Sequence, residues 1–272
     1  MVRYPTDTQH AQLDRHFSAV AGRYRRLRDL DLRTARHVAH LLTRLRRAGP
    51  LRVLDIGSGT GRYLEAVVQL ALAEHGVLCD ALACDASPAM LRIGAVGAPA
   101  RPVGLQRVAG LAELLPFRKA AFDAVVCFNA IHHFDLDGFL RHASRVLRGA
   151  GMLIVYTRTR EQNQRTVWGE LFPHFGERET RLYSAEELQA AVMRVPQFRS
   201  VSLRVARWRM ETTPARLLRQ AMGRCYSTFD FYEPAEFNAA LHTFRWRLLM
   251  ASRTDSQLTV QNDHLVVVAR RY

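Results

Sequence analysis

Three glycines at every second position follow Asp55 and Ile56 in the stretch VLDIGSGTGRYLEAV. A short apolar run, 51–56, precedes them, and an alanine- and leucine-rich run with helical spacing, 62–73, follows them. The pattern predicts a buried strand, a tight turn and a helix. Glycine lets the backbone approach a ligand closely, and the helix N-terminus offers free N–H groups. The glycines are Gly57, Gly59 and Gly61, and Ser58 stands between the first two.

Several kinds of turn compete for this stretch. A phosphate-binding loop needs a lysine followed by serine or threonine after the last glycine, where this chain has Arg62 and Tyr63. A dinucleotide-binding turn has the spacing G-x-G-x-x-G, which argues against a nicotinamide-dependent oxidoreductase. The spacing here is D-x-G-x-G-x-G. A purely structural turn without a ligand is the remaining alternative.

A second acidic residue, Asp85, ends the next apolar run, 81–84. At the carboxyl end of a strand, a carboxylate can accept two hydrogen bonds from ribose hydroxyl groups. The alternative is that Asp85 caps the helix that starts at Ser87 and Pro88.

The elements around these residues alternate between strands and helices. Apolar runs predict a short strand within 105–117, a strand within 122–134 whose buried run is 125–128, and another strand over 152–159, with a helix over 136–151. This alternation favours right-handed crossovers and a doubly wound α/β fold that binds ligands at the carboxyl ends of its strands. Further helices are predicted over 11–29, 31–49, 87–96, 184–195, 213–224 and 233–252, and further strands over 198–210 and 264–272.

Composition sets the broad class. The 272 residues suffice for one large α/β domain, and no apolar run reaches the roughly 18 residues that predict a membrane span. The N-terminus lacks the apolar core of a secretory signal and the cysteines lack metal-ligand spacing, so we expect a cytoplasmic protein. The net charge is +14, with Lys119 as the only lysine. This charge indicates either an arginine-rich solvated surface or a nucleic-acid footprint.

The spacing D-x-G-x-G-x-G resembles motif I of the class I S-adenosylmethionine-dependent methyltransferases. Further along, GLAELLPFRKAAFDAVVCFNAIHHF is similar to the G-D-A-x-x-L-P-F…F-D-x-V…H-H stretch of the family that includes the ubiquinone and menaquinone C-methyltransferases. DASPAML is similar to the segment after strand two of small-molecule methyltransferases, and FSAVAGRYRRL to their N-terminal lead-in. The main resemblance covers roughly residues 50 to 156.

The resemblance implies a Rossmann-like, mostly parallel seven-stranded sheet with helical cap insertions. It implies S-adenosyl-L-methionine as cofactor, S-adenosyl-L-homocysteine as product and no metal. Met90 matches a residue that packs on the adenine, although core packing is an alternative. The family's adenine-binding aspartate is replaced by Leu111, so backbone groups near Leu111 and Ala112 are expected to recognise the adenine. The residues implied to bind the cofactor are Tyr24, Asp55, Gly57, Ser58, Gly59, Gly61, Asp85, Ala86, Met90, Leu111, Ala112 and Asn129.

The candidate catalytic residues follow the fourth strand. The resemblance places Asn129 beside the methionyl group and the methyl acceptor. His132 and His133 come next, and either can act as a general base because imidazole titrates near neutral pH. The alternative is that the pair shapes the pocket without taking a proton. Tyr24 matches a tyrosine that folds over the cofactor, or else lies on a surface helix, and Arg25 replaces the aspartate usual beside it.

Two aromatic segments, RTVWGELFPHF and CYSTFDFYEPAEF, are candidates for the walls of a substrate pocket. The alternative is that these aromatic side chains form a core within a helical cap. Three arginines near the exit of the fifth strand could pair with an anionic acceptor. They are Arg158, Arg160 and Arg165.

We therefore expect methyl transfer to a small organic acceptor, at oxygen, nitrogen or carbon, such as an intermediate of natural-product biosynthesis. The expected organisation is an N-terminal helical lid over 1–48, a cofactor-binding core over 49–160, and the last strands with substrate-cap helices over 161–272. The alternatives are an RNA methyltransferase and a cofactor-binding, non-catalytic partner subunit. No membrane partner is expected, and the sequence leaves open whether the chain is a monomer or a homodimer.

Overall fold

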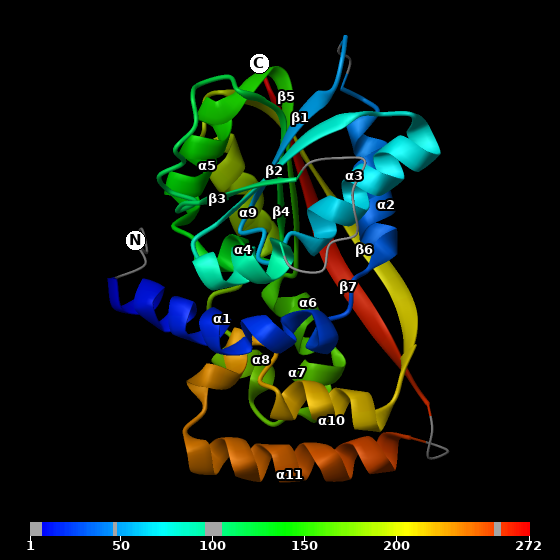
Figure 1. Cartoon of the computed structure of the whole chain (residues 1–272). Coiled ribbons are helices and arrows are strands. Elements are labelled where there is room, and N and C mark those ends of the chain that lie inside the picture. The colour runs from blue at the N-terminus through cyan, green and yellow to red at the C-terminus, as the bar shows by residue number, and fades with distance from the viewer. Residues whose placement is uncertain (1–6, 46–47, 96–104, 253–256) are drawn as a thin grey trace.

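A seven-stranded sheet forms the centre of the molecule in the computed structural model, which describes residues 7–45, 48–95, 105–252 and 257–272 (Figure 1). The strand order is β3-β2-β1-β4-β5-β7-β6. The first five strands are parallel, and β7 is antiparallel to both of its neighbours. The strands are β1 (Leu51–Ile56), β2 (Cys79–Asp85), β3 (Gln106–Ala109), β4 (Phe122–Phe128), β5 (Leu147–Thr157), β6 (Phe198–Thr212) and β7 (Leu258–Arg271).

Helices cover both faces of the sheet. Figure 1 shows α5 and α9 on one face and α2 and α3 on the other. The α-helices are α1 (Asp7–Leu27), α2 (Leu32–Leu42), α3 (Arg62–His75), α4 (Pro88–Ala95), α5 (Leu136–Val146), α6 (Arg160–Gln164), α7 (Val167–Leu171), α8 (Phe175–Arg178), α9 (Ala185–Met193), α10 (Pro214–Met222) and α11 (Pro234–Ala251). Two short 3₁₀ helices are η1 (Ile131–His133) and η2 (Ser227–Phe231).

The central strand β4 is buried along its whole length. Val125 and Cys127 belong to the cluster packed with α5 and α9, whereas Ala124 and Val126 belong to the cluster packed with α2 and α3. Alternate side chains of a strand point to opposite faces, so an all-apolar run is what a sheet covered on both sides requires. The predicted doubly wound, mostly parallel α/β fold is confirmed.

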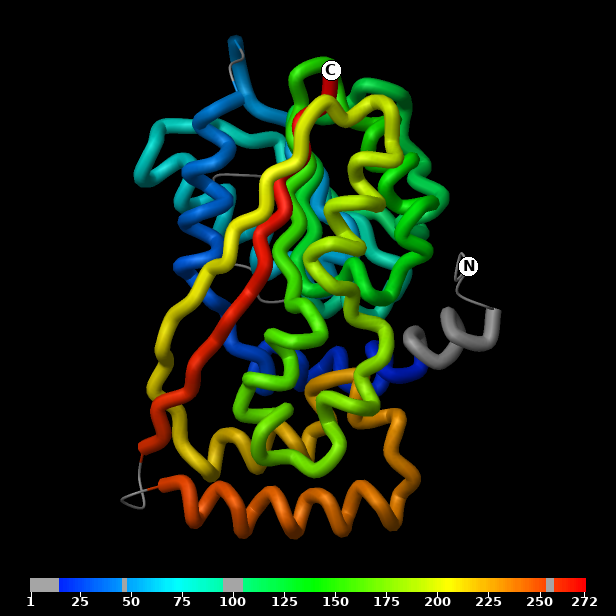
Figure 2. Tube along the Cα trace, turned by 180° about the vertical axis from the view of Figure 1, so that it is seen from behind, coloured from blue at the N-terminus to red at the C-terminus, as the bar shows by residue number. Residues whose placement is uncertain are grey.

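The remaining helices form a cap beyond the carboxyl ends of the strands. The helices α6, α7 and α8 follow β5, while α10, η2 and α11 connect β6 to β7. Figures 1 and 2 both show β6 and β7 running together from the sheet to the cap, with α11 at the far end. The cap has its own core, which includes Trp168, Phe172, Phe229, Tyr232 and Phe244. Most of the predicted cap aromatics therefore fill this core.

Strand and helix ends differ from the predictions. The second strand begins at Cys79 instead of residue 81, whereas the fourth begins at Phe122, the first residue of its predicted segment. The helix predicted over 136–151 ends at Val146, directly before β5, and Gly149 and Gly151 lie inside the irregular start of that strand. Flanking Arg, Asp and Gly residues hid these ends because hydrogen bonding to a neighbouring strand continues past the apolar run.

Other predicted features are confirmed or lie outside the described residues. Ser184 and Glu187 form a capping box at the start of α9, within the predicted helix over 184–195, and β6 is an edge strand. The four cysteines are buried free thiols. No described helix combines the length and apolarity needed to cross a membrane. Residues 1–6 and 46–47 of the predicted lid segment, and residue 96 of the predicted fourth helix, lie outside the described residues.

Candidate functional site

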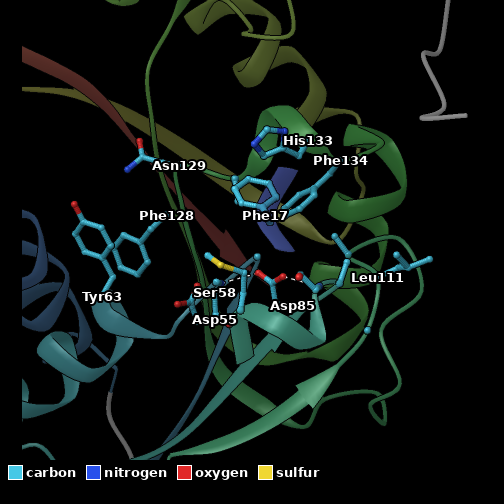
Figure 3. Close-up of a pocket in the computed structure, with 18 of the residues that line it drawn as sticks. Phe17, Asp55, Ser58, Tyr63, Asp85, Leu111, Phe128, Asn129, His133 and Phe134 are labelled. Carbon is cyan, nitrogen blue, oxygen red and sulfur yellow. Dashed lines mark hydrogen bonds between the residues drawn. The ribbon is translucent and has the colours of Figure 1, made fainter. Parts of the chain in front are cut away.

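A cavity of about 400 Å³ lies at the carboxyl ends of β1, β2 and β4 (Figure 3). From β1 the chain continues to β2 and β3 on one side of β1, whereas β4 and β5 lie on its other side. The strand order therefore reverses at the carboxyl end of β1, beside the cavity. Crossovers diverge at such a point and leave a crevice above the sheet. The cavity volume is within the range of small-ligand sites.

The glycine turn forms the floor of this cavity and is fixed to the end of β2. The backbone N–H groups of Gly57 and Ser58 both donate to the Cys84 carbonyl oxygen, at 2.9 and 3.1 Å. Gly57 has φ +67° and Gly59 has φ +56°, the left-handed region that favours glycine. A Cβ on Gly57 would lie 2.6 Å from the Cβ of Ala130. The turn therefore requires glycine both for its backbone conformation and for its close packing.

The Asp85 carboxylate links this turn to the start of α4. Its Oδ2 accepts from the Gly59 N–H at 2.6 Å, and its Oδ1 accepts from the Ser87 N–H at 2.8 Å. Asp85 thus makes the local capping contact that was the alternative to ribose binding, and it also lines the cavity. Each carboxylate oxygen has a second lone pair, so the two functions are compatible.

Three lining side chains present buried oxygens that have no hydrogen-bond partner among the described residues: Asp55 Oδ1, Ser58 Oγ and Ser87 Oγ. Burial, together with the negative charge of Asp85, raises the pKa of Asp55 well above its ordinary value. Two neighbouring carboxyls in a buried site favour a cationic ligand, because a positive charge offsets their mutual repulsion. Unpaired buried polar atoms are costly unless a ligand satisfies them.

Most residues that the sequence predicted to bind a cofactor line the cavity. Gly61 does not; it caps the N-terminus of α3, and a Cβ there would approach Leu105. The carboxylate of Glu113, beside the predicted adenine-binding residues, accepts from the Asp135 N–H at 2.7 Å. The predicted residues that line the cavity are Tyr24, Asp55, Gly57, Ser58, Gly59, Asp85, Ala86, Met90, Leu111, Ala112 and Asn129.

Asn129 directly follows β4 and has a left-handed backbone conformation, with φ +53°. Its N–H donates to the Tyr156 carbonyl oxygen of β5 at 2.7 Å, which holds the residue in place. Asparagine tolerates this conformation better than most residues. Non-glycine residues held in sparsely populated backbone regions concentrate at functional sites.

The helix α1 supplies one wall of the cavity through Phe17 and Tyr24, with Arg28 just beyond its end. Arg25 donates to the Thr60 carbonyl oxygen at 3.1 Å and forms an ion pair with Glu65 at 3.2 Å. The arginine at the position of the family's usual aspartate therefore ties α1 to the glycine turn and α3. This packing favours the predicted lid position for Tyr24 over a free surface helix.

A smaller chamber of about 70 Å³ adjoins the cavity between α1 and the cap. Phe17, Tyr24, Arg28, Asn129 and His133 line both spaces. Arg158 lines the smaller chamber, whereas Arg160 contacts Leu182 and Glu187 and Arg165 lies 3.7 Å from Asp263. Of the predicted arginine trio, only Arg158 therefore reaches the chamber.

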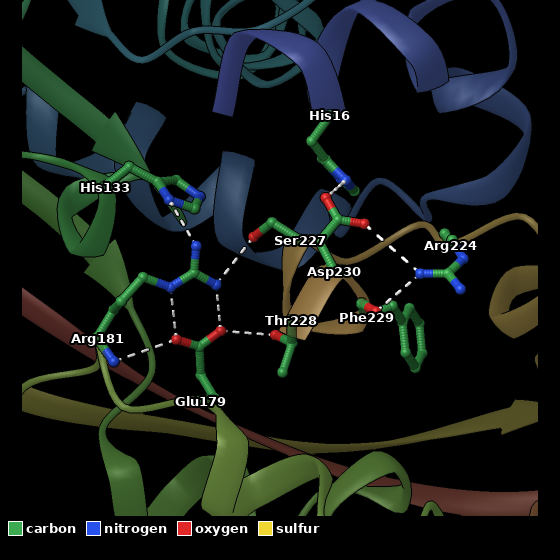
Figure 4. A network of polar contacts seen from close by, with 9 residues as sticks. All are labelled: His16, His133, Glu179, Arg181, Arg224, Ser227, Thr228, Phe229 and Asp230. Carbon is green, nitrogen blue, oxygen red and sulfur yellow. Dashed lines mark hydrogen bonds and ion pairs between the residues drawn. The ribbon is translucent and has the colours of Figure 1, made fainter. Parts of the chain in front are cut away.

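The two histidines occupy different positions. His133 lines both spaces, and His132 lines only the smaller chamber. Figure 4 shows Arg181 between His133, Ser227 and Glu179. The Arg181 guanidinium lies 3.4 Å from Nδ1 of His133. A guanidinium only donates, so Nδ1 accepts and Nε2 carries the proton of the neutral imidazole.

Burial and nearby positive charge keep both imidazoles neutral. Burial lowers the pKa of His132 to about 4, with Arg181 and Arg28 acting in the same direction and Glu179 against them. Burial, His132 and Arg181 lower the pKa of His133 well below its ordinary value. Although burial alone would raise it, the contacts with Arg181 hold the pKa of Glu179 at about 2. Glu179 is therefore ionised and paired.

Acid is expected to destabilise the protein through His132. The unfolded chain binds a proton at histidine below about pH 6.5, while folded His132 stays neutral down to pH about 4. Between these two pH values the unfolded state binds more protons than the folded state. Each unit by which the pH is lowered therefore reduces the free energy of unfolding by about 1.4 kcal/mol. The wild-type protein loses unfolding free energy between pH 7 and pH 5, and His132→Asn should make this loss smaller by about 2 kcal/mol. Denaturant titrations at the two pH values measure the difference.

The exposed His242 offers the matched control for this measurement. His242→Asn should leave the slope of unfolding free energy against pH as in the wild type. An unchanged slope in His132→Asn would contradict the assignment of the acid sensitivity to this imidazole.

Several lining residues were not predicted. Phe17, Arg28, Phe128 and Phe134 line the main cavity, and Glu179 lines the smaller chamber. Arg28 stands in an arginine-rich run, so nothing in its sequence context distinguished it from a surface cation. Glu179 lies in a cap segment, whose position relative to the sheet depends on tertiary packing alone.

Residues 54–155 match the family described as Methyltransferase domain. A ubiquinone/menaquinone biosynthesis C-methyltransferase from Methylobacterium nodulans is 33% identical over 159 residues, which cover 56% of this chain and 61% of that protein. A mouse protein named probable tRNA methyltransferase 9B is 32% identical over 117 residues, 42% of this chain. The chain spans only 23%, 22% and 22% of the length of the mouse, cattle and human proteins of that name.

Solved structures share the fold. One assigned to a methyltransferase of an antibiotic biosynthesis pathway in Anabaena variabilis has a TM-score of 0.64 and 18% identity. The match covers 89% of this chain and 98% of that one. At this identity the likeness shows the architecture, including the sheet that positions the cavity.

Proposed function

Because the chain belongs to the class I S-adenosylmethionine-dependent methyltransferases, with S-adenosylmethionine as cofactor, we propose that it transfers a methyl group to a small organic acceptor. The observation that carries the proposal is the arrangement of the two spaces. A cofactor-sized cavity over the glycine turn adjoins a small chamber between α1 and the cap.

The residues around the turn fit this cofactor. Asp85 is positioned for the ribose hydroxyls, and Ser58 and Ser87 offer unpaired oxygens beside it. Asp55 supports binding of a ligand that carries positive charge, as S-adenosylmethionine does on its sulfur and its amino group. Leu111 replaces an acidic contact to the adenine, so apolar packing with Met90 and backbone groups near Ala112 recognise the base.

When bound, the cofactor supplies an electrophilic methyl group on a positively charged sulfur. The contribution of this chain is to hold the acceptor in line with that methyl group and to exclude water. Asn129 and His133 line the junction of the two spaces and orient the acceptor there. His133 acts as a hydrogen-bond donor through Nε2 and not as a base, because Nδ1 is engaged by Arg181 and the pKa is low.

A small acceptor is favoured over RNA by the size of the chamber. About 70 Å³ holds roughly five water-sized groups, which is less than a nucleobase with its sugar needs. The α1 wall and the cap also enclose this side of the site. Most of the described arginines are exposed or half-buried, so the charge of +14 is that of an arginine-rich solvated surface and does not require nucleic acid.

The test is transfer of labelled methyl from S-adenosylmethionine to fractions of a cell extract. Label is expected in the small-metabolite fraction and not in purified transfer RNA. An Asp85→Asn variant is the negative control because it lacks the ribose carboxylate. Label in RNA would overturn the small-acceptor assignment, whereas cofactor binding without label in any fraction would favour a non-catalytic partner subunit.

A further inference from the structure

The smaller chamber brings three nitrogen donors together from separate parts of the chain. Arg28 follows α1, Arg158 follows β5, and Asn163 lies in α6. Nη1 of Arg28, Nε of Arg158 and Nδ2 of Asn163 are buried and have no hydrogen-bond partner among the described residues. Buried donors without acceptors are costly, and the three residues that carry them line one space, which points to a ligand rich in acceptors.

The chamber also carries positive charge that the described part of the chain does not neutralise. Neither Arg28 nor Arg158 forms an ion pair there. Arg28 stacks over the Tyr226 ring at 4.0 Å, and Arg158 donates to Oδ1 of Asn262 at 2.9 Å. These contacts fix both guanidinium groups without removing their charge.

Among the described residues that line the chamber, the one carboxylate is already engaged. Glu179 is paired with Arg181 and accepts from the Thr228 hydroxyl at 2.6 Å (Figure 4). His132 and His133 are held neutral, so they add no charge to the chamber. The surplus of cations over anions therefore comes from Arg28 and Arg158.

We propose that the methyl acceptor is a small organic acid whose carboxylate binds between Arg28 and Arg158 in this chamber. The inference rests on the proposed function, because it names the substrate class of that same site. A carboxylate matches the planar donor fork of arginine and fits a space of about 70 Å³. The rest of the acceptor then extends past Asn129 and His133, where the two spaces join.

The test is binding of simple carboxylates to protein saturated with S-adenosylhomocysteine. Propionate and benzoate are titrated against propionamide and benzamide, which keep the shape but lack the charge. In calorimetry or thermal-shift titrations, at least one carboxylate should bind at least tenfold more tightly than its amide. Arg158→Gln should weaken that binding about tenfold and leave the affinity for S-adenosylhomocysteine unchanged, because Arg158 does not line the cofactor cavity.

Arg160→Gln is the matched control, since Arg160 follows two residues later and points to Leu182 and Glu187 instead. It should bind carboxylates as the wild type does. Equal affinity of the wild type for carboxylates and amides, or an equal loss of carboxylate affinity in the two arginine variants, would overturn the carboxylate site. If cofactor binding is retained in that case, the proposed function still stands. Failure of the wild type to bind S-adenosylhomocysteine would instead overturn the proposed function.

Discussion

Gly57→Ala is expected to abolish cofactor binding and to destabilise the fold by about 2–5 kcal/mol. An L residue at φ +67° costs about 1–2 kcal/mol. The new Cβ would lie 2.6 Å from the Ala130 Cβ and 2.7 Å from Cζ of Phe134, an overlap that costs about 1–3 kcal/mol more. Relief requires the turn or η1 to move, and both border the cavity. Denaturant unfolding measures the loss of stability, and S-adenosylhomocysteine titration of the folded variant measures the loss of cofactor binding.

Two other glycines separate backbone strain from collision. Gly76 has φ +65° and ends α3, but a Cβ there meets nothing within 4 Å. Gly76→Ala should lower the free energy of unfolding only by the cost of the backbone strain, and it should leave the cofactor affinity unchanged. A Cβ on Gly59 would lie 3.2 Å from the flexible tip of Met90. The losses of stability and cofactor affinity in Gly59→Ala should therefore lie between those of Gly76→Ala and Gly57→Ala. Equal stability and affinity in Gly57→Ala and Gly76→Ala would contradict the close packing of the turn.

Asp85→Asn is expected to weaken cofactor binding by about 100-fold or more. The amide keeps one acceptor oxygen but sets an N–H₂ group against one of the backbone donors, Gly59 N–H or Ser87 N–H. It also removes the charge offered to the ribose hydroxyls. Hydrogen bonds to charged groups contribute about 1.5–3 kcal/mol each, and loss of two corresponds to at least about 100-fold in affinity. Equilibrium dialysis with labelled S-adenosylmethionine measures the change.

Asp80→Asn is the matched control for this substitution. Asp80 lies on the same strand, β2, and its side chain is exposed. The variant should bind the cofactor with wild-type affinity. If Asp85→Asn did the same, the carboxylate would serve only to fix the turn to α4.

The sheet and the cofactor side of the site were predictable because local patterns specify them. Gly57 and Gly59 need a backbone conformation that few residues adopt, and Asp85 is a polar residue at the end of an apolar strand. The burial of β4 on both faces likewise follows from an uninterrupted apolar run. In each case one short segment of sequence carries the whole signal.

The acceptor side was not predictable because it is assembled from distant segments. Arg28, Arg158 and Arg181 stand in three different segments of the chain, and each has other arginines close to it in the sequence. The aromatic segments of the cap were recognisable in the sequence, but the function of each ring was not. A ring that fills the cap core and a ring that lines a pocket have the same sequence pattern. Trp168 and Phe172 belong to the core, whereas Tyr226 lines the chamber. Only tertiary packing separates these cases.

The most direct test of the cofactor site is a calorimetric titration of the wild-type chain with S-adenosylmethionine and with S-adenosylhomocysteine. We expect one micromolar site per chain for each compound. Absence of binding by both compounds would contradict it, and the glycine turn would then serve a different ligand or the fold alone.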